Sequence, residues 1–497
     1  MKNTKTLSER CACAVVLAAG LAVMLGGKAS GEPIALENAT VITCKDGAGF
    51  TIEKGTLVID EGKIVSVGAG VAVPAGAKRI DCTGKVIMPG LVDTHSHIGG
   101  AAGADSSGPI QPDVRILDSI NPRDSGFRRA VAGGLTTINV MPGSGHLLSG
   151  QTIYLKLRKP AGKDDSPGRI EEWCFAKEDG SVMGGMKMAN GTNSIGNPPF
   201  PGTRGKSAAL VREQYIRAQE YAEGRTRWLA KPEAERGDPP GRELAMEGLG
   251  ECLRGERIVQ HHTHRADDIM TVLRMAEEFK FRVVLHHTSE AWKVADEIAK
   301  ADTGWGSKGI KGTPVSAIVV DSPGGKLEAA DMSHATGAIL EKAGVTVAFH
   351  TDDWITDSRL FLRSAALSVR AGMTREGALK ALTINGAMML DLEKRVGTLE
   401  AGKDADFVIL SGDPLSVYTH VEQTWVEGTK VFDRSVAEDR LMATGGFGAG
   451  REQQPYLCCV GGAVGSGGGG FTFNGKQWGN GNATGNSGSD AQAGGGQ

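Results

Sequence analysis

The segment KVIMPGLVDTHSHIG, residues 85–99, places two histidines directly behind a short apolar run that starts after Pro89 and Gly90. If the run is a strand, His95 and His97 point to the same face, because residues i and i+2 of a strand share a side. Two imidazoles on one face can aim their nitrogen atoms at one point, as a first-row metal ion requires. Alone, the spacing is more typical of polar residues in a loop after a strand, so the rest of the chain decides.

The chain has 497 residues, of which 40% are hydrophobic and 23% are charged. This length and composition allow a large core and more than one domain. The formal net charge of −3 provides no broad basic surface for nucleic acid. We therefore expect a globular protein without a nucleic-acid partner.

The first 31 residues are typical of a secretory signal peptide. Lys2, Lys5 and Arg10 precede an apolar run at 14–25, and small residues follow at 29–31. The apolar run is too short to cross a bilayer as a helix. We expect export to the periplasm or cell envelope and no membrane span in the mature chain, with an uncleaved anchor as the alternative.

Composition changes again at the other end of the chain. Residues 445–497 are rich in Gly, with Asn, Ser and Gln between the glycines. Such a segment buries too little apolar area to fold alone, which predicts a disordered tail.

The cysteines do not form a CxxC pair, which disfavours a thiolate zinc site. An oxidising compartment permits disulfides, and Cys44 and Cys82 fall in the same segment. A disulfide between them and two buried free thiols are both compatible with the sequence.

Two blocks near the ends of the chain are rich in β-branched residues between Gly, Asp and Pro: residues 32–88 and 396–440. This pattern predicts antiparallel strands with tight turns. Two such blocks can meet and form one small β domain.

The region between them, residues 89–395, alternates strand-like and helix-like segments. Strand-like runs occupy 135–141, 257–260, 281–286 and 345–350. Residues 266–279 place Ile269, Met270, Leu273 and Ala276 on one side of a predicted helix. The alternation indicates a parallel α/β fold, and the length suits a (β/α)₈ barrel with an insertion or elaborated crossover at 204–255.

Polar clusters follow three of these runs. His264 follows the run at 257–260. His286 ends the run at 281–286 and His287 comes directly after it, and His350 precedes Asp352 and Asp353. In a (β/α)₈ barrel, all strands open at their carboxyl ends on one face. Together with His95 and His97, these side chains would converge, which predicts a metal site.

The sequence resembles the amidohydrolase superfamily, in the branch near imidazolonepropionase and the metal-dependent dipeptidases. The resemblance covers about residues 33–433. The segments that carry it are KVIMPGLVDTHSHIG, HTHRADDIMTVLRMAEEF, VVLHHTSEAWKVADEIAKA, VTVAFHTDD and ALTINGAMMLDLEKRVGTLEAGKDADFVIL. It implies a (β/α)₈ TIM barrel with a composite β-sandwich built from both chain ends.

The resemblance also implies a set of metal ligands. By position in the motifs, these are His95, His97, His264, His287 (rather than His286) and Asp352. Many relatives add a lysine, carboxylated by CO₂, or a glutamate that bridges two metals.

Lys187 could be the carboxylated lysine, with an ordinary surface lysine as the alternative. Some relatives carry a glutamate where this chain has Thr192, and if that glutamate is the bridge, this chain lacks it. The donor set suits a divalent metal, above all Zn²⁺, and one or two ions remain open.

The chemistry that follows is hydrolysis of a carbon–nitrogen bond in a cyclic amide or peptide-like small molecule. Asp352 would serve as general base for a metal-activated water. His146, Arg265, His350 and Asp353 could contact the substrate or support the ligands.

Two other functions are compatible with the sequence. A homo-oligomer is possible for each of them. One is a heterocyclic amine deaminase of the same fold, although residues 265–268, RADD, lack the glutamate usual for such enzymes. The other is an exported, non-catalytic binding protein with a degraded metal site.

Overall fold

The computed structural model describes residues 32–99, 105, 107–158, 167–317, 326–353, 355–445, 471–473 and 476–478. The predicted signal peptide lies outside the described residues, as does most of the predicted tail. Within the tail segment, β18 (Phe471–Phe473) pairs antiparallel with β19 (Lys476–Trp478). Among the described helices, none has the length and apolar character needed to cross a membrane.

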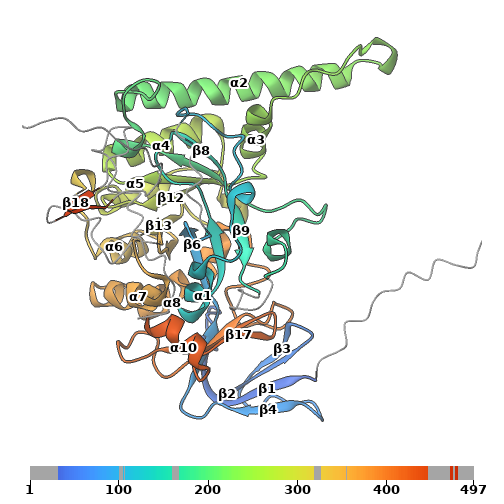
Figure 1. Cartoon of the computed structure of the whole chain (residues 1–497), viewed down its shortest axis with the longest axis vertical. Coiled ribbons are helices and arrows are strands. Elements are labelled where there is room, and N and C mark those ends of the chain that lie inside the picture. The colour runs from blue at the N-terminus through green and yellow to red at the C-terminus, as the bar shows by residue number, and fades with distance from the viewer. Residues whose placement is uncertain are drawn as a thin grey trace, which may run out of the picture.

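The two ends of the described chain share one eight-stranded sheet, which is blue and orange at the bottom of Figure 1. Its strands are β1 (Ile34–Ile42), β2 (Thr51–Asp60), β3 (Lys63–Gly68), β4 (Lys78–Asp81), β5 (Val86–Pro89), β15 (Phe407–Leu410), β16 (Val421–Val426) and β17 (Thr429–Asp433). The two chain ends meet where β5 pairs antiparallel with β15, with Ile87 opposite Ile409. Phe407 stacks on Trp425 in the core of this sheet, at a ring separation of 5.4 Å.

The prediction of antiparallel strands in residues 32–88 is wrong for two strands. Both β4 and β5 pair parallel with β1. The chain leaves β3 at one edge of the β1–β2–β3 ladder and returns beside β1 on its other side, so the connection at 69–77 crosses the sheet. Residue alternation reveals a strand but not its direction.

The middle region has a TIM-barrel-like α/β fold. Its strands are β6 (Leu91–Ser96), β7 (Leu135–Val140), β8 (Leu148–Gln151), β9 (Ile153–Lys156), β10 (Met186–Ala189), β11 (Val259–Thr263), β12 (Val283–His287), β13 (Val315–Ala317) and β14 (Val347–Phe349). They form two sheets, in the orders β14-β13-β12-β11-β10-β8 and β6-β7-β9. The ladder from β10 to β14 is parallel, as expected.

Strands β8 and β9 depart from the expected parallel arrangement of the barrel strands. Here β8 is antiparallel to β10, and β9 is antiparallel to β7. Thr152 alone separates β8 from β9, so one continuous segment pairs antiparallel with β10 in its first part and with β7 in its second. Between β6 and the segment after β14, the described residues form a single bridge, Ser96 to Asp353, instead of a ladder.

Helices cover the middle region and extend beyond it. They are α1 (Ser125–Ala132), α2 (Arg204–Ala230), α3 (Leu244–Leu253), α4 (Ala266–Phe279), α5 (Ala295–Lys300), α6 (Thr336–Lys342), α7 (Phe361–Arg370), α8 (Arg375–Ala381), α9 (Ile384–Met389) and α10 (Ala437–Thr444). The predicted helix at 266–279 is confirmed as α4, which buries Ile269, Leu273 and Ala276. The expected insertion contains the long helix α2, at the top of Figure 1, which packs on α3 and α4.

A buried ion cluster joins the middle region to the sheet of the chain ends. Lys156 on β9 is fully buried and pairs with Asp404, with Asp406 at 3.1 Å and with Glu427 at 3.4 Å. Removal of one buried partner would leave the opposite charges uncompensated, so this cluster contributes to the relative placement of β9 and β15.

The described cysteines are Cys44, Cys82, Cys174 and Cys252, and all four are buried free thiols. Of the two alternatives for Cys44 and Cys82, the structure shows buried free thiols and no disulfide. Burial raises the pKa of Cys44 to about 12, which keeps this thiol protonated and unreactive.

Candidate metal centre

The carboxyl ends of β6 and β14 bring the first group of polar side chains together. His97 Nε2 lies 3.0 Å from Asp352 Oδ1, and His95 Nε2 lies 3.3 Å from both His97 Nε2 and Asp352 Oδ1. All three side chains are buried. Donor atoms of neighbouring ligands in a tetrahedral zinc site are about 3.3 Å apart, given Zn–N distances near 2.0–2.1 Å. The spacing of this group matches that requirement.

Asp93, inside the apolar run of β6, fixes the relative position of the two strand ends. Its carboxylate accepts hydrogen bonds from the amides of His95 (3.1 Å) and Thr351 (3.0 Å) and from the Thr351 hydroxyl. The amide of Asp352 in turn donates to the carbonyl of His95 at 2.9 Å. Burial raises the pKa of Asp93 to about 7. An acid near the start of a fully buried strand is a sequence signal for this role.

The backbone is strained where two of the predicted ligands lie. Asp352 has φ +47° and His287 has φ +67°, and Thr288 follows with φ +47°. Non-glycine residues rarely adopt this left-handed conformation, and it clusters at functional sites where the surroundings enforce it. The strain turns these side chains toward the cluster at the ends of their strands.

Hydrogen bonds orient the imidazoles so that one nitrogen of each ring remains for a ligand. His97 Nδ1–H donates to the carbonyl of Met141 at 2.8 Å. His264 Nδ1 is hydrogen bonded to Ser289 Oγ at 2.8 Å, and within the described part of the chain its buried Nε2 has no hydrogen-bond partner. The same holds for Nε2 of His287. Outer partners of this kind fix the tautomer and orientation of metal-binding histidines.

The charge states also suit a cation. Burial holds the pKa of His95, His264 and His287 well below the usual range, so these imidazoles are neutral. For Asp352, burial favours the protonated form, but the hydrogen bond and charge of His97 outweigh it, so the pKa of the carboxyl is lowered. Neutral imidazoles and an ionised carboxylate are the forms that bind a divalent metal.

Lys187 on β10 is a fully buried residue of the same cluster. Its exposed fraction is 0%, its Nζ lies 3.3 Å from His95 Nε2, and it contacts Met141 Sδ at 3.2 Å. The alternative of an ordinary surface lysine is therefore wrong.

Two buried residues that the sequence analysis did not select lie beside the predicted ligands. His262 on β11 lies with its ring 4.3 Å from that of His287, and with His264 and Glu328 it forms another group of potential ligands. His262 and His264 have the i, i+2 spacing of His95 and His97, so the same rule would have found His262. Glu328 belongs to a short 3₁₀ helix, Leu327–Ala329, and no strand-end pattern indicates it.

Glu328 places a carboxylate beside the position where a glutamate was expected and Thr192 occurs. The amide of Thr192 donates to Glu328 Oε2 at 2.8 Å. Lys326 Nζ lies 2.7 Å from Glu328 Oε1 and 3.3 Å from His262 Nε2, so an ammonium group already neutralises this carboxylate. The carboxylate is thus a neighbour of the cluster whose charge is balanced within the protein.

The residues expected to contact substrate lie in different environments. Arg265 pairs with Asp267 at the start of α4, with its side chain 45% exposed, and no contact between the described residues joins it to the cluster. His146 packs against Phe200, at a ring separation of 5.4 Å. Asp353 accepts hydrogen bonds from Ser358. His350 lies within the cluster, with Nε2 3.2 Å from His287 Nδ1.

The chain is similar to proteins of known family. A model of the amidohydrolase family matches residues 259–432. The crystal structure of an amidohydrolase from Thermotoga maritima is 33% identical, with a TM-score of 0.69, and the match covers 81% of this chain and 100% of that chain.

Two further relatives match most of the chain at lower identity. Amidohydrolase tasK from Hapsidospora irregularis is 26% identical over 82% of this chain and 44% of its own length, so this chain spans less than half of tasK. A 5-methylthioadenosine/S-adenosylhomocysteine deaminase from Symbiobacterium thermophilum is 26% identical over 77% of this chain and 86% of its own length.

Proposed function

Because the chain belongs to the amidohydrolase family, we propose that it is a metal-dependent hydrolase that cleaves carbon–nitrogen bonds of a small cyclic amide or peptide-like molecule. The observation that carries this proposal is the group His95, His97 and Asp352, whose donor atoms lie 3.0–3.3 Å apart in a buried site. Few structural roles require two imidazoles and a buried carboxylate to face one another at ligand spacing.

The residues present fit a divalent cation, and Zn²⁺ best. His95, His97 and Asp352 would hold one ion. His264, through its unpartnered Nε2, and His287 would contribute to a second. Lys187, as a carbamate, would add a carboxylate-like ligand between them, which agrees with its burial beside His95.

When bound, a divalent cation polarises the scissile carbonyl and lowers the pKa of water toward neutrality. Asp352 remains ionised in its buried position, so it can accept a proton from the attacking water and transfer it to the leaving nitrogen. The Met141 carbonyl holds His97 through Nδ1–H, and the carbonyl of His95 holds the amide of Asp352. These contacts place the base before the substrate arrives, so little reorganisation is required in the transition state.

Deamination of a heterocyclic amine is the second candidate. It is favoured by the similarity to a relative named as a deaminase and by Glu328, a buried carboxylate beside His262 and His264. A carboxylate at this place could act as the proton donor that the segment RADD lacks. The ion pair of Glu328 with Lys326 counts against this role, because the carboxylate is already engaged by a cation.

A non-catalytic binding protein with a degraded metal site is the third reading. The donor set around His95 retains its predicted members at ligand spacing, which counts against degradation. We further propose that the chain is exported, acts on a small molecule, and folds its two end segments as one β domain against a barrel. Homo-oligomerisation is compatible with this proposal and does not enter the chemistry.

A substrate screen distinguishes the candidates. The purified full-length chain, loaded with Zn²⁺, is incubated with cyclic amides, N-acyl amino acids, dipeptides and heterocyclic amines, and the products are identified by mass spectrometry. Chelator-sensitive formation of a carboxylate and an amine supports the proposed hydrolase. Ammonia release from a heterocyclic amine supports the deaminase, and metal binding without turnover of any compound supports the binding protein.

A further inference from the structure

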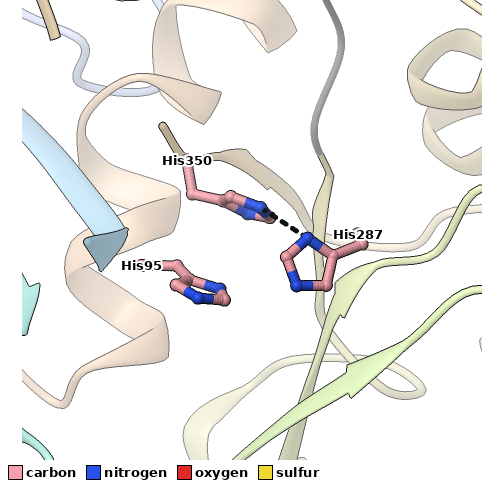
Figure 2. A group of neighbouring side chains, drawn as sticks. All are labelled: His95, His287 and His350. Atoms are coloured by element: carbon pink, nitrogen blue, oxygen red, sulfur yellow. Dashed lines mark hydrogen bonds between the residues drawn. The ribbon is translucent and has the colours of Figure 1, made fainter. Parts of the chain in front are cut away.

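His350 is a third buried imidazole at the centre of the site, beside His95 and His287. One potential ligand atom from each of the three residues lies within 4.8 Å of those of the other two. Figure 2 shows the three rings around a common space, with His350 directed at His287. We propose that His350 is a metal ligand that forms, with His95 and His287, a three-imidazole set for a divalent cation. This inference rests on the proposed function.

The distance between the facing nitrogen atoms of His350 and His287 matches that of two ligands of one metal ion. His350 Nε2 and His287 Nδ1 are 3.2 Å apart, close to the separation of about 3.3 Å expected for two nitrogen ligands of a tetrahedral zinc ion. The group contains no carboxylate, so an ion there would be held by three neutral donors, as in catalytic zinc sites with three histidines. His95 also belongs to the group with His97 and Asp352, so the two sets adjoin at this residue.

A chain of hydroxyl groups orients His350 from the other side of the ring. Its Nδ1 lies 2.7 Å from Ser316 Oγ on β13, and Ser316 Oγ lies 2.6 Å from Thr94 Oγ1 on β6. All three side chains are buried. With Nδ1–H donated to Ser316, Nε2 carries the lone pair that faces His287, and the ring cannot rotate without loss of this hydrogen bond. Ser316 is thus a positioning residue of the kind that accompanies metal-binding histidines.

The same contacts disfavour direct recognition of a substrate by His350. The residue is 1% exposed, and both of its ring nitrogens face protein groups, Ser316 on one side and His287 on the other. A substrate contact would require one nitrogen to be directed toward an accessible space. A metal ion needs only the small volume between the rings that His350 and His287 already face.

The test measures Co²⁺ binding by the purified full-length chain, with metal content and the visible absorption of Co²⁺ as readouts. The variants are His350→Asn and Ser316→Ala, and the matched control is His286→Asn. His286 is an equally buried histidine whose Nε2–H donates to Gln260 Oε1 at 2.6 Å. Thermal melting of the metal-free proteins shows whether each variant folds.

We expect Ser316→Ala to weaken Co²⁺ affinity by about 10–100-fold, the usual effect of losing an outer partner. His350→Asn should weaken affinity at least as much and change the Co²⁺ absorption band, whereas His286→Asn should retain both. If His350→Asn and Ser316→Ala keep wild-type affinity and spectrum while KM rises, His350 contacts substrate and the inference is overturned. If the wild type binds no divalent cation, the proposed function fails together with this inference.

Discussion

His97 Nε2 lies 3.0 Å from Asp352 Oδ1, although the two residues follow the first and last strands of the middle region, β6 and β14. Asp93 holds these strand ends together through the amides of His95 and Thr351. The pair combines an imidazole with its second nitrogen fixed by Met141 and a carboxylate whose pKa is lowered. The proposed mechanism depends on this pair, because in it the same carboxylate would serve as ligand and as base.

Asp352→Asn preserves the size of the side chain but removes its basicity. We expect hydrolysis to fall by about 10²–10⁴-fold, the contribution of a positioned general base. The four histidines His95, His97, His264 and His287 remain, so at least one metal ion should stay bound. Steady-state kinetics and elemental analysis of the same preparation check both parts.

The matched control for this variant is Asp353→Asn. Asp353 is equally buried, but its carboxylate is directed at Ser358 and belongs to none of the ligand groups. It should lower kcat by less than about 10-fold, below the range of a general base. Equal losses in the two variants would show that Asp352 acts through structure and not as the base.

Lys187→Ala tests whether the lysine is a metal ligand. If Lys187 carries a carbamate between two ions, metal content should decrease by about one ion per chain and activity should collapse. Elemental analysis after full metal loading, with mass spectrometry of the intact protein, provides the measurement. Retention of the full metal content and most of the activity would show that Lys187 is a buried neighbour of the ligands only.

Lys156→Met removes the other fully buried lysine near the strands of the middle region and leaves Asp404 and Asp406 without their closest cation. Breaking a buried ion pair from one side costs about 3–5 kcal/mol of unfolding free energy. Denaturant unfolding should show this loss, while metal content should remain at the wild-type value. Lys156→Met thus also serves as a control for Lys187→Ala.

The same cluster predicts a pH dependence. Burial disfavours the ionised form of Asp404, but Lys156, Lys63 and Arg395 outweigh it and lower its pKa from 3.8 to about 2. A carboxyl with a lowered folded-state pKa stabilises the fold above its unfolded pKa, and this contribution is lost as pH falls through the folded value. Unfolding free energy should therefore decrease between about pH 4 and pH 2. The decrease should be smaller in Lys156→Met, and an unchanged profile would contradict the assignment.

The signal peptide prediction concerns residues outside the described part of the chain. Cleavage after the small residues at 29–31 should give an exported protein that begins between residues 29 and 33. N-terminal sequencing of the protein from its native compartment gives the answer. Recovery of a chain that still begins at Met1 would contradict export by a cleaved signal.

The parts of the fold that have strong local patterns could be predicted. The helix at 266–279 was recognised because its apolar residues recur with helical spacing. The strand-like apolar runs at 257–260 and 281–286 overlap β11 and β12, whose bounds in the structure lie one to three residues further along the chain. Strand direction could not be predicted in this way. Pairing of β4 and β5 with β1, and of β8 with β10, depends on where connecting segments cross, which alternation does not encode.

The same distinction applies to the site. The proximity of His95, His97, His264, His287 and Asp352 was predictable because each follows a strand-like run, and strand ends converge in an α/β fold. The choice of these residues over neighbours such as His286 came from the resemblance to the amidohydrolase superfamily. His262 was missed because only the last histidine of the segment HHTH was selected, although His262 shares a face with His264. Glu328 could not be found, since it reaches the cluster from a short 3₁₀ helix whose position depends on tertiary packing. The orienting role of Ser316 depends on the register of β13 and β14, which only the structure provides.

In the proposed mechanism, a divalent cation at the group of His95, His97 and Asp352 is required for hydrolysis of a carbon–nitrogen bond. The direct measurement is hydrolysis by the full-length chain after complete chelation, followed by titration with Zn²⁺ and elemental analysis at each step. If hydrolysis depends on the bound cation, activity disappears in the metal-free protein and returns in proportion to the bound metal. Activity that survives complete removal of the metal would contradict it.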